Sequence, residues 1–401
     1  MSATTQHNEA IKNPGSYQIP SGLKSVLSVL ALVGVITFVI GFSTDAKRMW
    51  PSFLQNHFFF MSLALGGMFF AALQWMTGAM WSAPVRRLAE SFTAFLPWVL
   101  GGLLLLYFGR HELYRWTDAS FVKGDIILEG KAGYLSVPFF FIRNAIAVLL
   151  WIFFAKKMIG NSIAQDQSKD PALTVRNRTL SPGFLILFAL TFTMVSFDLV
   201  MSLDPYWFST MFGVYCFAGL FYSTLAATTL MAIYLRRKGA LVGIVNDNHL
   251  HDLGKFMFAF TVFWAYIGFS QFMLIWYANM PEETGYFITR MKDGWYAVSV
   301  FLLVGKFATP FFFLLPRGSK RSEKMLWCMG WFMLIAQWID VMWMVQPEFY
   351  AHAPRFGWME AGITLGFIGA FGLVVFRFLA RNNIVAIGDP RLAESVHHHH
   401  Q

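Results

Sequence analysis

Long apolar stretches separated by short polar segments follow one another along nearly the whole chain. Each stretch has roughly the 20 residues that an α-helix needs to cross the hydrocarbon core of a bilayer. None alternates apolar and polar positions as a membrane barrel does, and backbone inside lipid must satisfy its own hydrogen bonds. The pattern therefore predicts an all-α integral membrane protein with ten transmembrane helices. The expected spans are 24–43, 55–79, 88–108, 137–155, 182–201, 209–234, 256–278, 295–315, 325–345 and 359–379.

Composition supports this class. The chain has 401 residues, of which 56% are hydrophobic and only 13% charged, against about 25% charged in a typical soluble domain. No segment between the expected spans is long enough to form a soluble domain with its own core. The protein is therefore expected to lie almost wholly within a membrane.

The basic residues predict an orientation. Twenty of the 31 Lys and Arg residues fall on the N-terminal tail, the even-numbered connections and the C-terminal end, against nine on the odd-numbered connections. Since connections rich in Lys and Arg stay in the cytoplasm, both termini are expected there. The net charge of +9 is explained by this bias, so no nucleic-acid partner is expected.

The chain offers few ligands for a cofactor. Its two cysteines, Cys216 and Cys328, are far apart, and neither a haem c attachment motif nor a cysteine set for an iron–sulfur cluster is present. His57 is the only histidine within an expected span. The sequence therefore predicts no metal or redox cofactor bound by this chain.

Four full charges lie within expected spans, namely Arg143, Asp198, Lys306 and Asp340. Each costs about 2.5–3.5 kcal/mol at the centre of a membrane helix, so they must be paired, hydrated or next to a cavity. Arg143 and Asp198 fall near the outer interface, where a salt bridge is expected. Lys306 lies deeper than Asp340 by roughly 9 Å of helical rise, so that pair is expected to need the full lysine length or a water.

Two segments repeat one design. "SFDLVMSLDPYWFS" (196–209) and "WIDVMWMVQPEFYA" (338–351) both place a proline seven residues after the acid. Base then acid, twice, on spans of matching direction indicates two parallel four-helix bundles flanked by the first and last helices. The expected divisions are 1–23 (cytoplasmic tail), 24–54 (first helix and outer loop), 55–208 and 209–358 (the two bundles), and 359–401 (last helix and cytoplasmic tail).

The four charges are candidates for proton transfer, the alternative being two ion pairs that lock the bundles. His57 and Gln271 are candidates for binding a quinone; the alternatives are an interfacial histidine and a helix-to-helix hydrogen bond. Polar residues within the spans are expected mainly in the outer half, with Gln74 as an exception. Gly362 and Gly366 form a GxxxG pattern that indicates close helix packing.

The segments "SFDLVMSLDPYWFSTMFGVYCFAGLFYS", "GFSQFMLIWYANMPEETGYFITR" and "HDLGKFMFAFTVFWAYIGFSQ" resemble the F subunits of bacterial alternative complex III, which are NrfD-like, polysulfide-reductase-like membrane proteins. The resemblance runs through essentially the whole chain and implies two four-helix bundles in a bacterial inner membrane. It also implies a respiratory quinol:cytochrome c oxidoreductase. The partners would be a homologous quinol-binding membrane subunit, an iron–sulfur subunit, multi-haem cytochrome c subunits and a terminal oxidase.

Other functions remain open at this point. The chain could be a second quinone-binding subunit of that complex, a purely structural scaffold within it, or a secondary transporter, and it could bind a quinone or a lipid. Transporters often interrupt helices at corresponding positions of their repeats, whereas Pro97 and Pro310 lie in the third and eighth spans, which do not correspond. The expected role is a cofactor-free subunit that supports electron transfer by its partners and provides a proton pathway.

Overall fold

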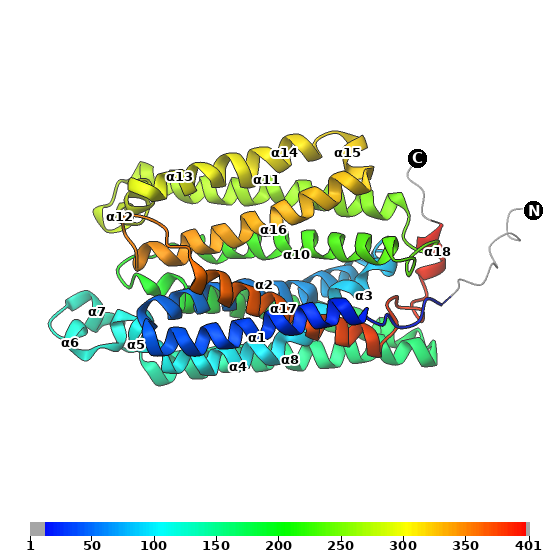
Figure 1. Ribbon diagram of the computed structural model, residues 1–401, viewed down its shortest axis with the longest axis horizontal. Coiled ribbons are helices and arrows are strands. Elements are labelled where there is room, and N and C mark those ends of the chain that lie inside the picture. The colour runs from blue at the N-terminus through cyan, green and yellow to red at the C-terminus, as the bar shows by residue number, and fades with distance from the viewer. Residues whose placement is uncertain (1–12, 398–401) are drawn as a thin grey trace, which may run out of the picture.

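A computed structural model describes residues 13–397, and these residues form helices without any strand (Figure 1). Ten of the helices, two of them interrupted, are long and apolar enough to cross a membrane. The predicted all-α membrane protein with ten spans is therefore confirmed. The first 12 residues of the expected cytoplasmic tail and the last four of the chain lie outside the described residues.

The spans are formed by the following elements, with the short helices between them given afterwards. The spans are α1 (Ser21–Thr44), α2 (Ala46–Thr77), α3–η1–α4 (Ala83–Phe92, Thr93–Phe95, Leu96–Phe108), α8 (Val137–Ser168), α9 with η3 (Ala172–Leu199, Met201–Leu203), α10 (Phe212–Arg237), α11 (Asp247–Ala278), α13–η4–α14 (Asp293–Phe301, Leu302–Ala308, Thr309–Leu314), α16 with η5 (Glu323–Val345, Gln346–Glu348) and α17 (Trp358–Arg381). The short helices are α5 (Arg110–Leu113), η2 (Arg115–Thr117), α6 (Ala119–Val122), α7 (Ile126–Lys131), α12 (Pro281–Arg290), α15 (Arg317–Arg321) and α18 (Leu392–Val396).

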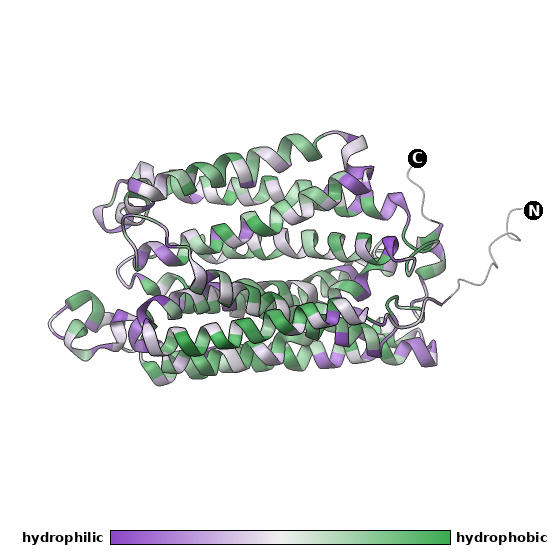
Figure 2. Cartoon of the chain, viewed as in Figure 1, coloured by the Kyte–Doolittle hydropathy of each residue, from purple (hydrophilic) through white to green (hydrophobic). Residues whose placement is uncertain are grey.

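The long helices lie side by side, so the molecule has two ends (Figure 1). One carries α5, α6, α7 and α12, and the other carries α15 and α18; we call them the α12 end and the α18 end. Apolar residues dominate the middle of the long helices and hydrophilic residues gather at both ends (Figure 2). This distribution is the one expected of helices that cross a bilayer.

Helix contacts divide most of the spans into two groups of four. In the first, α2 packs on α3, α4 and α9, and α8 packs on α4 and α9. In the second, α10 packs on α11 and α16, and η4 packs on α11 and α16. Contacts of α2 with α10 and α16 join the groups and make α2 and α10 the most buried spans.

The first and last spans form a separate pair. Helices α1 and α17 pack along their length and lie against α2 (Figure 1). At their crossing a Cβ on Gly366 would meet the Cα of Gly34, and one on Gly362 would meet the Thr37 side chain. The backbones can approach this closely because glycine has no side chain there.

Several helices extend beyond the apolar stretches at the α18 end. Helix α8 continues to Ser168 and α9 begins at Ala172, whereas the sequence predicts spans ending at 155 and starting at 182. Hydropathy marks the part of a helix that lies in hydrocarbon, while the helix itself continues as long as its backbone and caps allow. These extensions bring polar side chains together outside the apolar zone.

Candidate functional site

The first intramembrane ion pair joins α8 to α9. Arg143 Nε and Nη2 each donate to a different Asp198 oxygen at 2.7 Å, a bidentate contact. Asn144 Nδ2 donates to the same carboxylate at 2.7 Å, and the Tyr134 hydroxyl donates at 3.0 Å. Asp198 is fully buried and Arg143 is 7% exposed. The salt bridge expected from the sequence is present, and its carboxylate is surrounded by four donor groups.

The second pair joins the eighth span to α16. Lys306 Nζ donates to Asp340 Oδ2 and to Gln337 Oε1, the latter at 2.7 Å. The Tyr215 hydroxyl donates to Asp340 Oδ1, and Trp264 Nε1 donates to Oδ2 at 3.2 Å. Both charged side chains have no exposed surface. The ammonium also lies 4.0 Å from the centre of the Trp264 ring, a favourable cation–π contact.

Lys306 and Asp340 are in direct contact, so of the two alternatives that the sequence left open, the full lysine length and a water, the structure has the first. Lys306 lies in η4 (Leu302–Ala308), which is a π-helix. Pro310 lacks an N–H, and its ring would clash in a regular α-helix with the carbonyl four residues earlier, that of Lys306. That carbonyl instead accepts a hydrogen bond from the Tyr222 hydroxyl at 3.2 Å. The wider turn therefore changes the position of Lys306 from that expected of a straight helix.

A cavity of about 530 Å³ lies next to the second pair. Tyr215 and Trp264, the two neutral donors to Asp340, form part of its wall, and Gln271 lines it as well. Its lining includes Phe269 and Leu303, which lie within spans and are 63% and 64% exposed. The cavity therefore connects the membrane-facing surface of the second group with the residues around Asp340.

His57 lies elsewhere. It is buried in α2, its ring stacks on Phe53 with centroids 6.1 Å apart, and it packs against Gly102 of α4. Its Nε2 has no hydrogen-bond partner among residues 13–397. The structure does not bring His57 to the cavity that Gln271 lines, so the two quinone candidates do not form one site.

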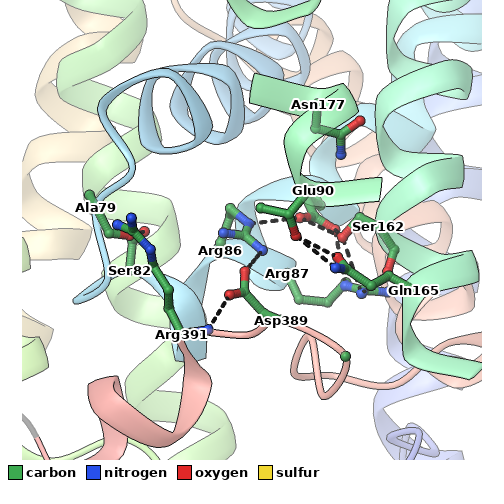
Figure 3. A network of polar contacts seen from close by, with 12 residues as sticks. Ala79, Ser82, Arg86, Arg87, Glu90, Ser162, Gln165, Asn177, Asp389 and Arg391 are labelled. Carbon is green, nitrogen blue, oxygen red and sulfur yellow. Dashed lines mark hydrogen bonds and ion pairs between the residues drawn. The ribbon is translucent and has the colours of Figure 1, made fainter. Parts of the chain in front are cut away.

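A buried polar network at the α18 end was not expected from the sequence (Figure 3). Arg86 binds Glu90 on its own helix and Asp389 from the C-terminal segment. Arg87 binds Glu90 and Asp166, each at 3.0 Å. Burial disfavours the charged form of Asp389, but Arg86 together with the backbone N–H and the charge of Arg391 outweighs it, so the pKa of this carboxyl lies below its usual range. The network attaches the C-terminal segment to α3 and α8.

This network lies at the α18 end, largely beyond the expected spans, so it is separate from the polar residues that the sequence predicts within the outer half. Two adjacent arginines followed by an acid at positions i+3 and i+4, "RRLAE", were the available signal. The expected third span began only at residue 88, and Ser162 and Asp166 were assigned to a loop. The structure places both of them on α8 and within reach of Arg87.

No group of three or more His, Cys, Asp or Glu side chains that could hold a metal ion occurs within residues 13–397. No protein-family model matches the chain, and no curated protein matches it in sequence. What the site can do must therefore be argued from its geometry. Arginine stays protonated in proteins, whereas a lysine ammonium can lose its proton. Of the two pairs, only Lys306–Asp340 combines two groups that can each gain or lose a proton, and its neighbours Tyr215 and Trp264 line a cavity.

Proposed function

We propose that this chain is a membrane subunit, without a redox cofactor of its own, of a quinol:cytochrome c oxidoreductase of the alternative complex III kind, and that it exchanges protons at Lys306 and Asp340. The observation that carries the proposal is the fully buried Lys306–Asp340 contact beside a cavity open to the membrane side. Ionisable groups held inside a membrane protein mark proton and ion pathways.

The chemistry follows from the hydrogen bonds. Transfer of one proton from the Lys306 ammonium to the Asp340 carboxylate converts two buried charges into a neutral amine and a neutral acid. The Tyr215 hydroxyl, which donates to charged Asp340, can then accept from the protonated acid and donate its own hydrogen towards the cavity. Gln337 remains beside the amine as an acceptor when Lys306 is charged again.

In this proposal the α12 end faces the outer side of a bacterial inner membrane and the α18 end faces the cytoplasm, in line with the distribution of Lys and Arg. Electron transfer belongs to partners: a homologous quinol-binding membrane subunit, an iron–sulfur subunit and multi-haem cytochrome c subunits, with a terminal oxidase as acceptor. The residues around Arg143 and Asp198 hold the first bundle together.

The test compares two matched double variants of the complete complex in liposomes. Lys306→Gln/Asp340→Asn and Arg143→Gln/Asp198→Asn each remove one buried pair while keeping amide groups in place. The measurement is the number of protons taken up and released per electron transferred. We expect the first variant to lower this number while electron transfer continues, and the second to leave it unchanged. Unchanged values in both would show that neither pair carries protons.

The cavity supports a second function, a quinone-binding site of this subunit. Its volume of about 530 Å³ and mostly aromatic and aliphatic lining suit a quinone ring or the start of its isoprenoid tail. Gln271 offers a hydrogen bond to such a ring. Ala265→Phe would fill part of the cavity, while Val262→Phe on the exposed face of α11 is the control. A quinone that co-purifies with the wild type and the control but not with Ala265→Phe would support this role.

A further inference from the structure

A second cavity, of about 520 Å³, lies at the α12 end where the two groups of helices meet. Its walls come from the beginning of α2, from α5 and η2, from η3, and from η5 with the segment that follows it. These parts of the chain are far apart in sequence, so only the folded arrangement creates the cavity. We refer to it as the junction cavity.

Basic side chains are concentrated around the junction cavity. Nine of the 31 Lys and Arg residues lie on the connections at the α12 end, and four of them line this cavity: Lys47, Arg48, Arg115 and Arg355. Arg48 forms an ion pair with Glu360 through two hydrogen bonds of 2.7 Å. Within residues 13–397, the other three have no carboxylate within ion-pair distance. Three positively charged side chains therefore line the junction cavity without a carboxylate as ion-pair partner.

The acidic side chains of the lining only partly compensate these cations. Asp45 caps α2 by accepting the backbone N–H of Arg48 at 3.2 Å. Glu348 binds Arg290, which is buried outside the cavity lining, at 3.2 Å. Glu112 is the remaining acid, and Asp45 keeps its negative charge while it caps the helix. Outside the ion pairs, the lining therefore has three positive and two negative side chains, an excess of one positive charge. Such a surface attracts an anionic group.

One wall carries a further unused donor. Tyr350 lines the cavity, and its buried hydroxyl has no hydrogen-bond partner among the described residues. The Arg355 guanidinium lies over its ring at 4.8 Å from the centre. A buried polar group without a partner costs about 1–3 kcal/mol, and a bound acceptor would recover part of that.

The wall around Tyr350 is held in place before any ligand arrives. Gln346 is almost fully buried, and its Oε1 accepts the Arg355 N–H at 3.2 Å. Its Nε2 donates to Gln55 of α2 at 3.2 Å, and its carbonyl accepts the Tyr350 N–H at 2.9 Å. A site whose side chains are already held in place has a smaller entropic cost of ordering when a ligand binds.

We propose that the junction cavity is a docking site for a carboxylate-bearing segment of a partner protein on the α12 side. The uncommitted cations supply charge complementarity, and Leu113, Leu203 and Phe349 add apolar surface for the stem of such a segment. The volume is far larger than a single small anion requires. The walls include residues from both groups of helices, among them the beginning of α2, which is the most buried span. The inference rests on the proposed function, which places partner subunits on this side.

Carbodiimide cross-linking of the native complex tests this directly. The reagent converts a carboxylate into an O-acylisourea. The Lys47 amine then attacks the acyl carbon, which forms an amide between the two chains and releases a urea. We expect mass spectrometry to identify Lys47 joined to an Asp or Glu of a partner protein. The yield should fall roughly tenfold or more in Arg115→Glu/Arg355→Glu, because like charges then face each other. Lys123→Glu, an exposed charge at the same end and outside the cavity, is the matched control.

The outcomes separate this inference from the proposed function. A complex that retains its redox partners while Lys47 reacts only with Glu112 overturns the docking site and leaves the function standing. An anionic phospholipid that co-purifies with the wild type and is lost in the double variant, without a cross-link, assigns the cavity to a lipid phosphate instead. A chain that purifies without redox proteins overturns the function and the docking site together. Arg115→Gln/Arg355→Gln replaces the charge-reversed variant if that one does not fold, and the same loss of cross-link is expected.

Discussion

The two intramembrane ion pairs occupy similar places in the two groups of helices and differ in how their charges are held. Asp198 receives two nitrogens of one rigid guanidinium together with an amide and a phenol. Asp340 receives one flexible ammonium together with a phenol and an indole. Both carboxylates are fully buried, so each depends entirely on these donors.

The difference lies in what each base can do. A guanidinium offers planar, paired hydrogen bonds and keeps its proton, so Arg143 stays charged beside Asp198. An ammonium is a compact charge on a long stem, and it can give up its proton when its surroundings favour the neutral form. One repeat thus contains a fixed clamp and the other a pair that can become neutral. Four predictions test this contrast, beginning with the largest expected effect.

Asp198→Asn should destabilise the protein by about 3–5 kcal/mol, because it leaves the Arg143 charge buried without its partner. Thermal unfolding in detergent, followed by tryptophan fluorescence, measures the loss. The double variant Arg143→Gln/Asp198→Asn should recover most of it, since no uncompensated charge remains. A single variant as stable as the wild type would contradict the clamp.

Asp340→Asn should cost less, about 1–3 kcal/mol, although Asp340 is as deeply buried. Lys306 can lose its proton when its partner is removed, which Arg143 cannot do. The same unfolding measurement applies. Equal losses for Asp198→Asn and Asp340→Asn would show that the two pairs behave alike and would remove the basis of the contrast.

Asn144→Leu and Gln337→Leu each remove one amide beside a pair, and each should cost about 1–2 kcal/mol. Asn144 donates to Asp198, whereas Gln337 accepts from Lys306. We therefore expect only Gln337→Leu to slow proton release by the reconstituted complex, because in the proposed function only Lys306 exchanges its proton. Slower release in Asn144→Leu would assign proton transfer to the first pair as well.

Tyr134 reports the charge on Asp198 through its own titration. Burial and the nearby carboxylate raise the pKa of Tyr134 to about 12, against a smaller opposing effect of Arg143. Because the proton binds more tightly in the folded state, the stabilisation is complete below the usual value of about pH 10 and is lost as the pH rises through about 12.

Ultraviolet absorbance of tyrosinate, with Tyr134→Phe subtracted, measures this titration. In Arg143→Gln/Asp198→Asn, the transition should move toward pH 10, since the charge of Asp198 is absent. A transition near pH 10 in the wild type would mean that Asp198 is not the charged acceptor of this hydroxyl.

The membrane class, the ten spans and the Arg143–Asp198 contact could be predicted because each depends on local patterns. Apolar length sets the spans, and one straight helical rise places Arg143 and Asp198 at one depth. The sequence left open whether Lys306 reaches Asp340 directly or through a water, because a uniform helix separates the two in depth by roughly 9 Å. Pro310, four residues after Lys306, was the available sign that the turn would be altered.

The network at the α18 end and the junction cavity at the α12 end could not be predicted from the sequence, for a different reason. Asp389 meets Arg86, and Arg115 approaches Arg355, only after distant segments have folded against each other. Hydropathy also ended the fourth span before Ser162, which removed α8 from the network at the α18 end. Local patterns identify which residues are charged and leave open which distant residues they meet.

The glycine contact between α1 and α17 has a consequence for how the protein is made. Gly34 is synthesised before the eight spans that lie between α1 and α17, and its partner Gly366 is synthesised after them. Apart from α17, helix α1 packs mainly on α2. Much of its surface is therefore exposed to lipid until the eight spans between α1 and α17 have been inserted. Insertion of α17, rather than folding of either bundle, is therefore the step that completes this helix pair. A chain that stops before α17 would expose the small-residue face of α1 to membrane quality control.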